Sequence, residues 1–148
     1  MRICGVEIKG TEAVVSLLEY KDGLFTLPDC RVRKVEFDKK NRASDLQYFQ
    51  ATFKKLLEDY KIDKTIIKER PLKGKFAGGA LGFKMEAGIQ LIDSQEVKLL
   101  NNSEIKAIIK KNPIPIPFTE TGLKIFQQGA FEAAYSEHMF IHYPIEAE

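Results

Sequence analysis

The feature that most constrains the fold is one long amphipathic segment that lies between two short β-type segments. The segment begins at Ser44, which forms a helix-capping box with Gln47 in the sequence pattern. Its apolar side chains recur at helical spacing, at Leu46, Phe49, Phe53, Leu56, Leu57 and Tyr60. Apolar stretches at residues 2–9 and 64–69 flank this segment. Because a strand, a long helix and a second strand normally form a parallel pair with a right-handed crossover, we expect such a pair here.

Three predicted strands joined by turns precede that helix. The first, at residues 2–9, has apolar residues on both faces, as in a central strand buried on two sides. The second is predicted at residues 13–20, and the Asp22-Gly23 pair after it is typical of a tight hairpin turn. We expect the third strand at residues 31–37. Together these strands predict an antiparallel meander.

The second half of the chain alternates predicted strands and helices. After the strand at 64–69, a glycine-rich basic stretch leads into a second helix. The remaining predicted elements follow in order: a strand at 96–100, a helix capped by Ser103, an extended proline-rich connector at 113–117 and a last helix at 119–140. We therefore predict one α/β domain over residues 1–148. Its mixed five-stranded sheet has three antiparallel strands, then two parallel ones, with helices on both faces.

The composition excludes several classes of protein. Hydrophobic residues make up 44% and charged residues 30% of the 148 residues, which is typical of a globular domain. No apolar run approaches the roughly 20 residues that cross a bilayer, and the N-terminus lacks a signal-peptide pattern, so we expect a cytoplasmic protein with no membrane partner. The net charge is only +2, so any contact with nucleic acid must be local. Cys4 and Cys30 are predicted to be free thiols, and no third ligand accompanies His138 and His142.

Two glutamates occupy comparable places in the two predicted parallel strands. Glu7 comes late in the first strand, and Glu69 ends the strand at 64–69. Ligands of open α/β sheets bind at the carboxyl edge, so both side chains are candidate site residues. Glu132, in the last predicted helix, is flanked by small residues that would let it approach the same edge. Carboxylates brought together need a cation, and hard oxygen ligands suit Mg²⁺ or Mn²⁺.

This order of elements resembles the ribonuclease H-like fold, and more narrowly the RuvC-type Holliday junction resolvases. The stretch from Arg2 to Glu7 resembles the family's first strand, which carries a glycine and then a catalytic acid. The residues around Glu69, the small residues at 78–82 and the stretch Glu132-Ala133-Ala134 resemble three further family segments. The chain also resembles, more closely, a bacterial family of conserved proteins of unknown function that is thought to share this fold.

The resemblance implies a divalent-metal-dependent nuclease that hydrolyses phosphodiesters of DNA or RNA with two metal ions. Glu7 would bridge both ions, while Glu69 and Glu132 would each hold one. Three lysines at and after the glycine-rich stretch would contact phosphates: Lys73, Lys75 and Lys84. A homodimer is expected by analogy, because a four-way junction presents two symmetric strands.

Two positions depart from the family pattern. Glu7 stands where the family has an aspartate, and its extra methylene moves the carboxylate. Gly129 stands where a further aspartate usually lies, one helical turn before Glu132. These differences support an alternative, in which the domain is a catalytically inactive binding or assembly module. A third reading, the use of this fold in sugar kinases and related ATPases, is disfavoured because those proteins need two such domains.

Overall fold

The computed structural model describes residues 1–71 and 79–144. The glycine-rich stretch with Lys73 and Lys75 lies outside these residues, so the prediction made for the two lysines stays a prediction. The described part of the chain contains six strands and four α-helices, in this order: β1 (Arg2–Lys9), β2 (Glu12–Lys21), β3 (Leu24–Thr26), β4 (Lys34–Glu36), α1 (Ala43–Asp59), β5 (Lys64–Lys68), α2 (Ala80–Gln90), β6 (Glu96–Leu100), α3 (Asn102–Lys111) and α4 (Gln128–His142). Two short 3-10 helices precede α4, at Phe118–Glu120 and Ile125–Gln127.

The strands form one mixed sheet with the order β3-β2-β1-β5-β6, and β4 also pairs with β2. β1 is antiparallel to β2 and parallel to β5, and β5 is parallel to β6. The predicted α/β class and the parallel pair across α1 are therefore confirmed. In place of the single third strand predicted at 31–37, two short strands, β3 and β4, pair with the outer edge of β2. The described sheet therefore has six strands and not five.

The hairpin turn explains this difference. Asp22 and Gly23 have φ values of 53° and 80°, and Lys21 pairs with Leu24. A two-residue loop with positive φ at both positions turns the chain back at once. β3 therefore starts directly after the turn, and only Lys34–Glu36 of the predicted third strand pairs with β2.

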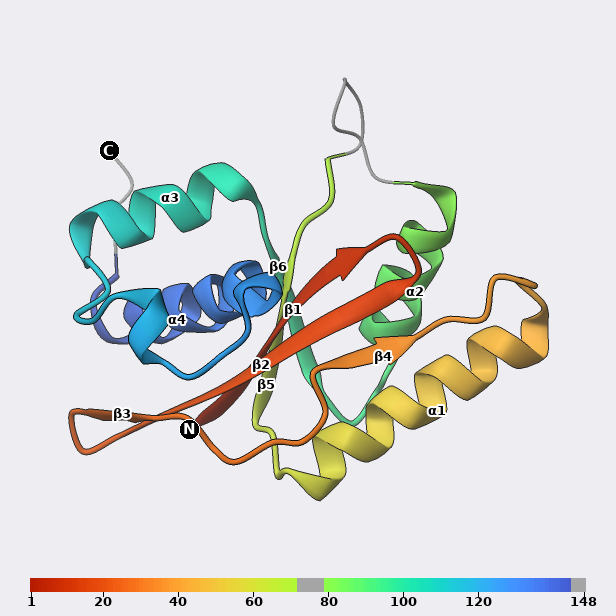
Figure 1. The fold of residues 1–148 in the computed structure, drawn as a ribbon, viewed down its shortest axis with the longest axis horizontal. Coiled ribbons are helices and arrows are strands. Elements are labelled where there is room, and N and C mark those ends of the chain that lie inside the picture. Colours follow the sequence, from red (N-terminus) through yellow and green to blue (C-terminus); the bar gives the residue numbers. More distant parts are fainter. Residues whose placement is uncertain (72–78, 145–148) are drawn as a thin grey trace.

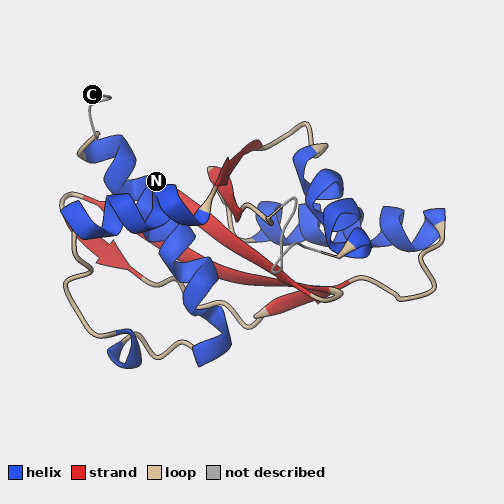
Figure 2. Ribbon diagram, turned by 90° about the horizontal axis from the view of Figure 1, so that it is seen from above, coloured by secondary structure: helices blue, strands red, loops and turns tan. Residues whose placement is uncertain are grey.

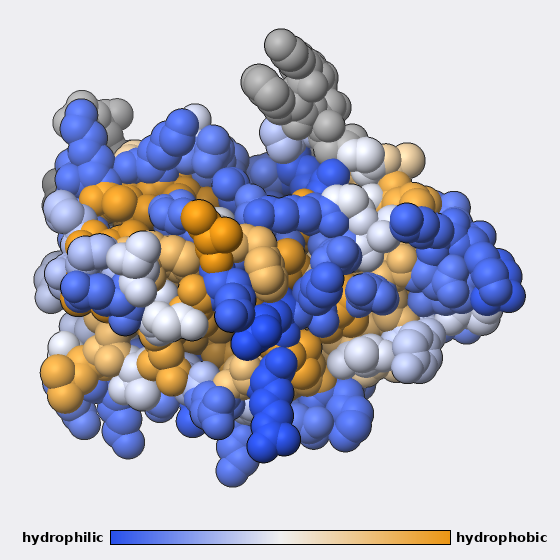
Figure 3. Space-filling view, viewed as in Figure 1, coloured by the Kyte–Doolittle hydropathy of each residue, from blue (hydrophilic) through white to orange (hydrophobic). Residues whose placement is uncertain are grey.

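The sheet lies between two pairs of helices. Figure 1 shows α1 and α2 on one side of the strands and α3 and α4 on the other, and Figure 2 shows the sheet as the middle layer. Cys4, Val6 and Ile8 of β1 pack in the core on the α1 and α2 side, whereas Ile3 packs in the core on the α4 side. This alternation buries both faces of β1, as predicted. On the side of the molecule shown in Figure 3, hydrophobic residues are concentrated toward α3 and α4.

The starts of three helices differ from the predictions. α1 begins one residue before Ser44, and the Asp45 carboxylate accepts the Arg42 backbone N–H at 3.0 Å. Asn101 caps α3 through the Glu104 backbone N–H at 2.8 Å, so Ser103 lies inside this helix. α4 begins at Gln128 rather than near residue 119, because the chain before it forms the two 3-10 turns.

Both cysteines are free thiols, as predicted: Cys4 is buried and Cys30 is partly buried. Burial raises the pKa of the Cys4 thiol above its usual range. Among the described residues, no helix combines the length and apolar character needed to cross a membrane.

Candidate functional site

Glu7 projects from β1 toward the start of α4. Its carboxylate lies so close to Gly129 that a Cβ on this glycine would stand 2.3 Å from Glu7 Oε1. The Glu7 side chain is only 19% exposed and forms ion pairs with two lysines, Lys68 at 3.2 Å and Lys9 at 3.4 Å. The missing side chain at position 129 thus makes room for the longer acid at position 7. Glu7 and Gly129, the two positions that depart from the resolvase pattern, therefore lie against each other.

Glu132 approaches the same place from α4. Burial raises the pKa of its carboxyl group, the nearby Lys68 ammonium opposes this rise, and the charge of Glu7 adds to it. Glu132 is half-buried. Glu132 therefore lies close enough to Glu7 and Lys68 for both charges to act on its carboxyl group, and its role as a site residue stays a prediction.

Glu69 lies on the other side of the sheet. In β5, Ile66 packs in the core on the α4 side and Ile67 in the core on the α1 and α2 side. Side chains alternate along a strand, so Lys68 shares the α4 side with Glu7 and Glu69 faces away. The Glu69 backbone N–H continues this pairing by donating to the Leu100 carbonyl at 2.8 Å. Glu69 therefore does not join Glu7 and Glu132, in contrast to the prediction that all three lie together.

Glu69 instead lies near a second charged group that the sequence analysis did not identify. Glu86 of α2 is buried, which raises its pKa, and the Glu69 charge adds to this rise while Arg70 opposes it. Arg70 donates to the Ile8 carbonyl at 2.6 Å and stacks over the Phe83 ring. Its guanidinium fits against Gly82, where a Cβ would lie only 2.5 Å from Cζ. In the sequence, the only signal for this charged group was Gly82, four residues before Glu86 in α2.

Of the three lysines predicted to bind phosphates, the structure describes Lys84, which lies in α2 with Glu86. Lys84 of α2 is exposed and its Nζ donates to the Asn41 side chain at 3.0 Å. Lys9, at the end of β1, donates to the Phe126 carbonyl at 3.1 Å while pairing with Glu7. Cationic side chains are therefore present around the carboxyl ends of β1 and β5.

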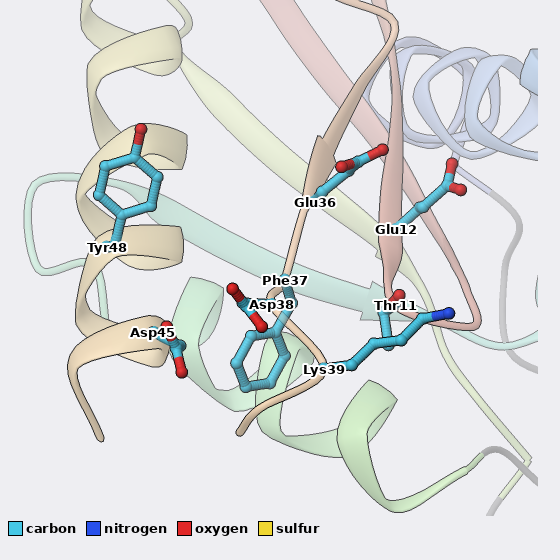
Figure 4. A pocket seen from close by; sticks show the side chains of 8 residues that line it. All are labelled: Thr11, Glu12, Glu36, Phe37, Asp38, Lys39, Asp45 and Tyr48. Atoms are coloured by element: carbon cyan, nitrogen blue, oxygen red, sulfur yellow. The ribbon is translucent and has the colours of Figure 1, made fainter. Parts of the chain in front are cut away.

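A cavity of about 550 Å³ opens beside β4 and the first turn of α1. Figure 4 shows its eight lining residues, which include four acids and one lysine: Thr11, Glu12, Glu36, Phe37, Asp38, Lys39, Asp45 and Tyr48. Glu7, Glu69 and Glu132 do not line it. This cavity is therefore distinct from the place where Glu7 and Glu132 meet.

The residues present do not fit a site for two divalent cations. The described residues hold no group of three His, Cys, Asp or Glu side chains placed to bind a metal ion. The ammonium of Lys68 lies 3.2 Å from Glu7, and its charge also acts on Glu132, so the carboxylates already have a cationic partner. Glu69, the third predicted ligand, is directed to the opposite side of the sheet. The chemistry that this arrangement offers is a balanced set of two carboxylates and two ammonium groups.

The fold is ribonuclease H-like, as comparison with solved structures shows. Thermus thermophilus RuvC matches with a TM-score of 0.73 and 11% identity, and the match covers 96% of each chain. RuvC from this organism in complex with a Holliday junction substrate matches with a TM-score of 0.70 and 14% identity over the same share of both chains. Fowlpox virus resolvase, in complex with Holliday junction DNA, matches with a TM-score of 0.50 and 14% identity and covers 97% of this chain and 99% of its own.

Within this fold, the chain belongs to the family described as protein of unknown function DUF3010, whose model matches residues 1–137. The resemblance to a family of unknown function is thus confirmed. No curated protein sequence matches the chain.

Proposed function

We propose that this protein is a resolvase-like nucleic-acid-binding domain that binds DNA or RNA without metal-dependent hydrolysis. The observation that carries the proposal is Lys68, which pairs with Glu7 at the carboxyl end of β5. An ammonium group there neutralises the carboxylates that would otherwise hold a metal ion. The domain keeps the fold of proteins that are described in complex with Holliday junctions, and this likeness over nearly the whole chain supports nucleic acid as the ligand.

Binding would depend on the backbone phosphates. The side chain of Lys9, at the end of β1, is 49% exposed, and Lys84 of α2 is exposed as well. Lysine side chains contact phosphate oxygens without reading base sequence. Lys73 and Lys75, which precede α2 in the sequence, belong to this proposal as further phosphate contacts. A homodimer also belongs to it, because a junction would present two equivalent strands, and sedimentation equilibrium would measure the oligomeric state.

The test is a binding titration with four labelled nucleic acids: a four-way DNA junction, duplex DNA, single-stranded DNA and an RNA–DNA hybrid. Fluorescence anisotropy would follow binding at 50 and 200 mM salt, with EDTA and with Mn²⁺. We expect at least one nucleic acid to bind in EDTA and to lose about tenfold or more in affinity at the higher salt, because bound phosphates release counterions. Lys84→Glu should weaken binding at both salt concentrations.

Lys55→Glu is the matched control, because Lys55 is an exposed lysine near the C-terminal end of α1, where it pairs with Asp59. This variant should bind as the wild type does. No affinity for any of the four nucleic acids at 50 mM salt would refute the proposal. Mn²⁺-dependent cleavage that disappears in Glu7→Gln would instead establish the metal-dependent nuclease implied by the resemblance, with Glu7 as one of its essential residues.

A further inference from the structure

The structure assigns to Lys68 the role of a permanent cation for Glu7 and Glu132, in the position where a divalent metal would otherwise bind. We infer that removing this ammonium group converts the place into a divalent-cation site. The inference concerns the chain alone and needs no nucleic acid. It rests on the same Lys68–Glu7 pair as the proposed function, but a failure to bind nucleic acid would leave it standing, so the two failures are distinguishable.

The backbone holds the lysine in this position. β1 and β5 are paired in parallel, with Val6 beside Ile67, so the next residues along the two strands are Glu7 and Lys68. Both side chains lie on the α4 side of the sheet, and Lys68 Nζ is 3.2 Å from Glu7 Oε2. The lysine side chain is only 27% exposed. The cation is thus supplied by the fold itself.

Two half-buried carboxylates explain why a cation is needed there. Burial raises the pKa of Glu132, and the charge of Glu7 adds to this rise. Like charges that are close together repel one another unless an opposite charge lies between or beside them. Lys68 supplies that charge from β5, while Lys9 pairs with Glu7 from the outer side at 3.4 Å. With these two ammonium groups in place, a divalent ion gains little from the carboxylates.

Gly129 completes the arrangement. A Cβ at this position would lie within 2.7 Å of three Glu7 side-chain atoms. The glycine therefore lets the Glu7 carboxylate pass beneath the first turn of α4. This is the same turn of chain that leads to Glu132, so both carboxylates are positioned by the contact of α4 with β1.

The test measures Mn²⁺ binding by calorimetry in the full chain, without nucleic acid. Lys68→Glu places a third carboxylate beside Glu7 and Glu132, and we expect it to bind Mn²⁺ about tenfold or more tightly than the wild type. Adding Glu7→Gln to this variant should return the affinity to the wild-type level. Wild-type protein that binds Mn²⁺ as tightly as Lys68→Glu would overturn the inference.

Lys55→Glu is the control for added charge. Lys55 pairs with a single acid, Asp59 at 3.2 Å, and its side chain is 76% exposed. If this surface variant gains as much Mn²⁺ affinity as Lys68→Glu, the gain comes from net charge and the inference is wrong. A gain confined to Lys68→Glu supports it.

A second variant covers the case in which Lys68→Glu does not fold. Lys68→Gln removes the ammonium without adding a charge, and it leaves Lys9 as the only described cation paired with Glu7. Its melting temperature should be below that of the wild type in EDTA and should rise when Mn²⁺ is added, because a ligand that binds the folded state stabilises it. A melting temperature that Mn²⁺ does not change would count against the inference.

Discussion

Gly5 lies at a position where the tertiary packing leaves no room for a side chain. It lies in the middle of β1, and α4 crosses directly over it. A Cβ at this position would stand 1.8 Å from the Ala130 carbonyl oxygen and 3.0 Å from the Ala134 Cβ. The obstacle is backbone, which cannot move aside as a flexible side chain can. This contact sets how closely α4 approaches the sheet, and therefore how Glu132 reaches Glu7.

We predict that Gly5→Ala destabilises the protein by about 3 kcal/mol or more, because an overpacked core must shift its backbone. The free energy of unfolding from urea denaturation measures this. Gly88→Ala is the control, since a Cβ there meets only Leu46 Cδ1 at 3.4 Å and Phe49 at 4.0 Å. This substitution inside α2 should be neutral or stabilise by up to about 1 kcal/mol. Equal effects of the two substitutions would contradict the packing argument.

At the scale of elements, a buried ion network joins α4 to β5 and β6. Glu137 of α4 is fully buried and accepts hydrogen bonds from Lys64 of β5 and Lys98 of β6, the latter at 2.8 Å. Lys98 also lies over the Phe140 ring at 3.9 Å. Glu96, which is exposed, pairs with the same Lys64 at 3.2 Å. One acid on the helix thus pairs with two lysines of adjacent parallel strands.

Glu137→Gln should cost about 3–5 kcal/mol of stability, because it removes the buried counter-charge of Lys64 and leaves only the exposed Glu96 beside it. Glu96→Gln removes the exposed partner of that lysine and should cost less than about 1 kcal/mol. Chemical denaturation of the two variants beside the wild type checks the difference. A loss of similar size in both would mean that burial does not decide the strength of this network.

At the scale of the whole molecule, one histidine couples stability to pH. His138 is fully buried between α4 and β2, and its Nε2 lies 2.8 Å from the Leu18 carbonyl oxygen. Its Nδ1 has no hydrogen-bond partner among the described residues. Burial lowers the pKa of His138 to about 4, from 6.5. The folded protein therefore keeps this imidazole neutral, whereas the unfolded chain would protonate it near pH 6.5.

Because the pKa of His138 is lower in the folded state, its contribution to stability is complete above about pH 6.5 and is lost as the pH falls toward about 4. We predict that the free energy of unfolding is about 2 kcal/mol lower at pH 5 than at pH 7.5 through this group. Urea denaturation at both pH values measures the change. His138→Gln should remove that part of the pH dependence, and a variant with the full wild-type dependence would show that other groups cause it.

Much of the architecture was predictable because it depends on local patterns. The helical spacing of Phe49, Phe53 and Leu57 defines α1 whatever surrounds it, and a strand on each side of α1 leaves the parallel crossover as the favoured connection. The Asp22-Gly23 turn chemistry predicted the hairpin correctly, although not the strand that follows it. An acid late in an apolar strand marked Glu7 as a candidate site residue. These features follow from periodicity and turn residues alone.

The tertiary structure decided which charged residues meet. Lys68 and Glu69 are neighbours in the sequence, but side chains alternate along a strand, so the two point to opposite sides of the sheet. The residue beside Glu7 is therefore the lysine and not the glutamate. The approach of Glu132 and the room at Gly129 depend on how α4 packs on β1, more than a hundred residues away. The sequence alone determined the elements and their order, because short-range periodicity specifies them. The composition of the site depended on register and on helix packing, which no local pattern records.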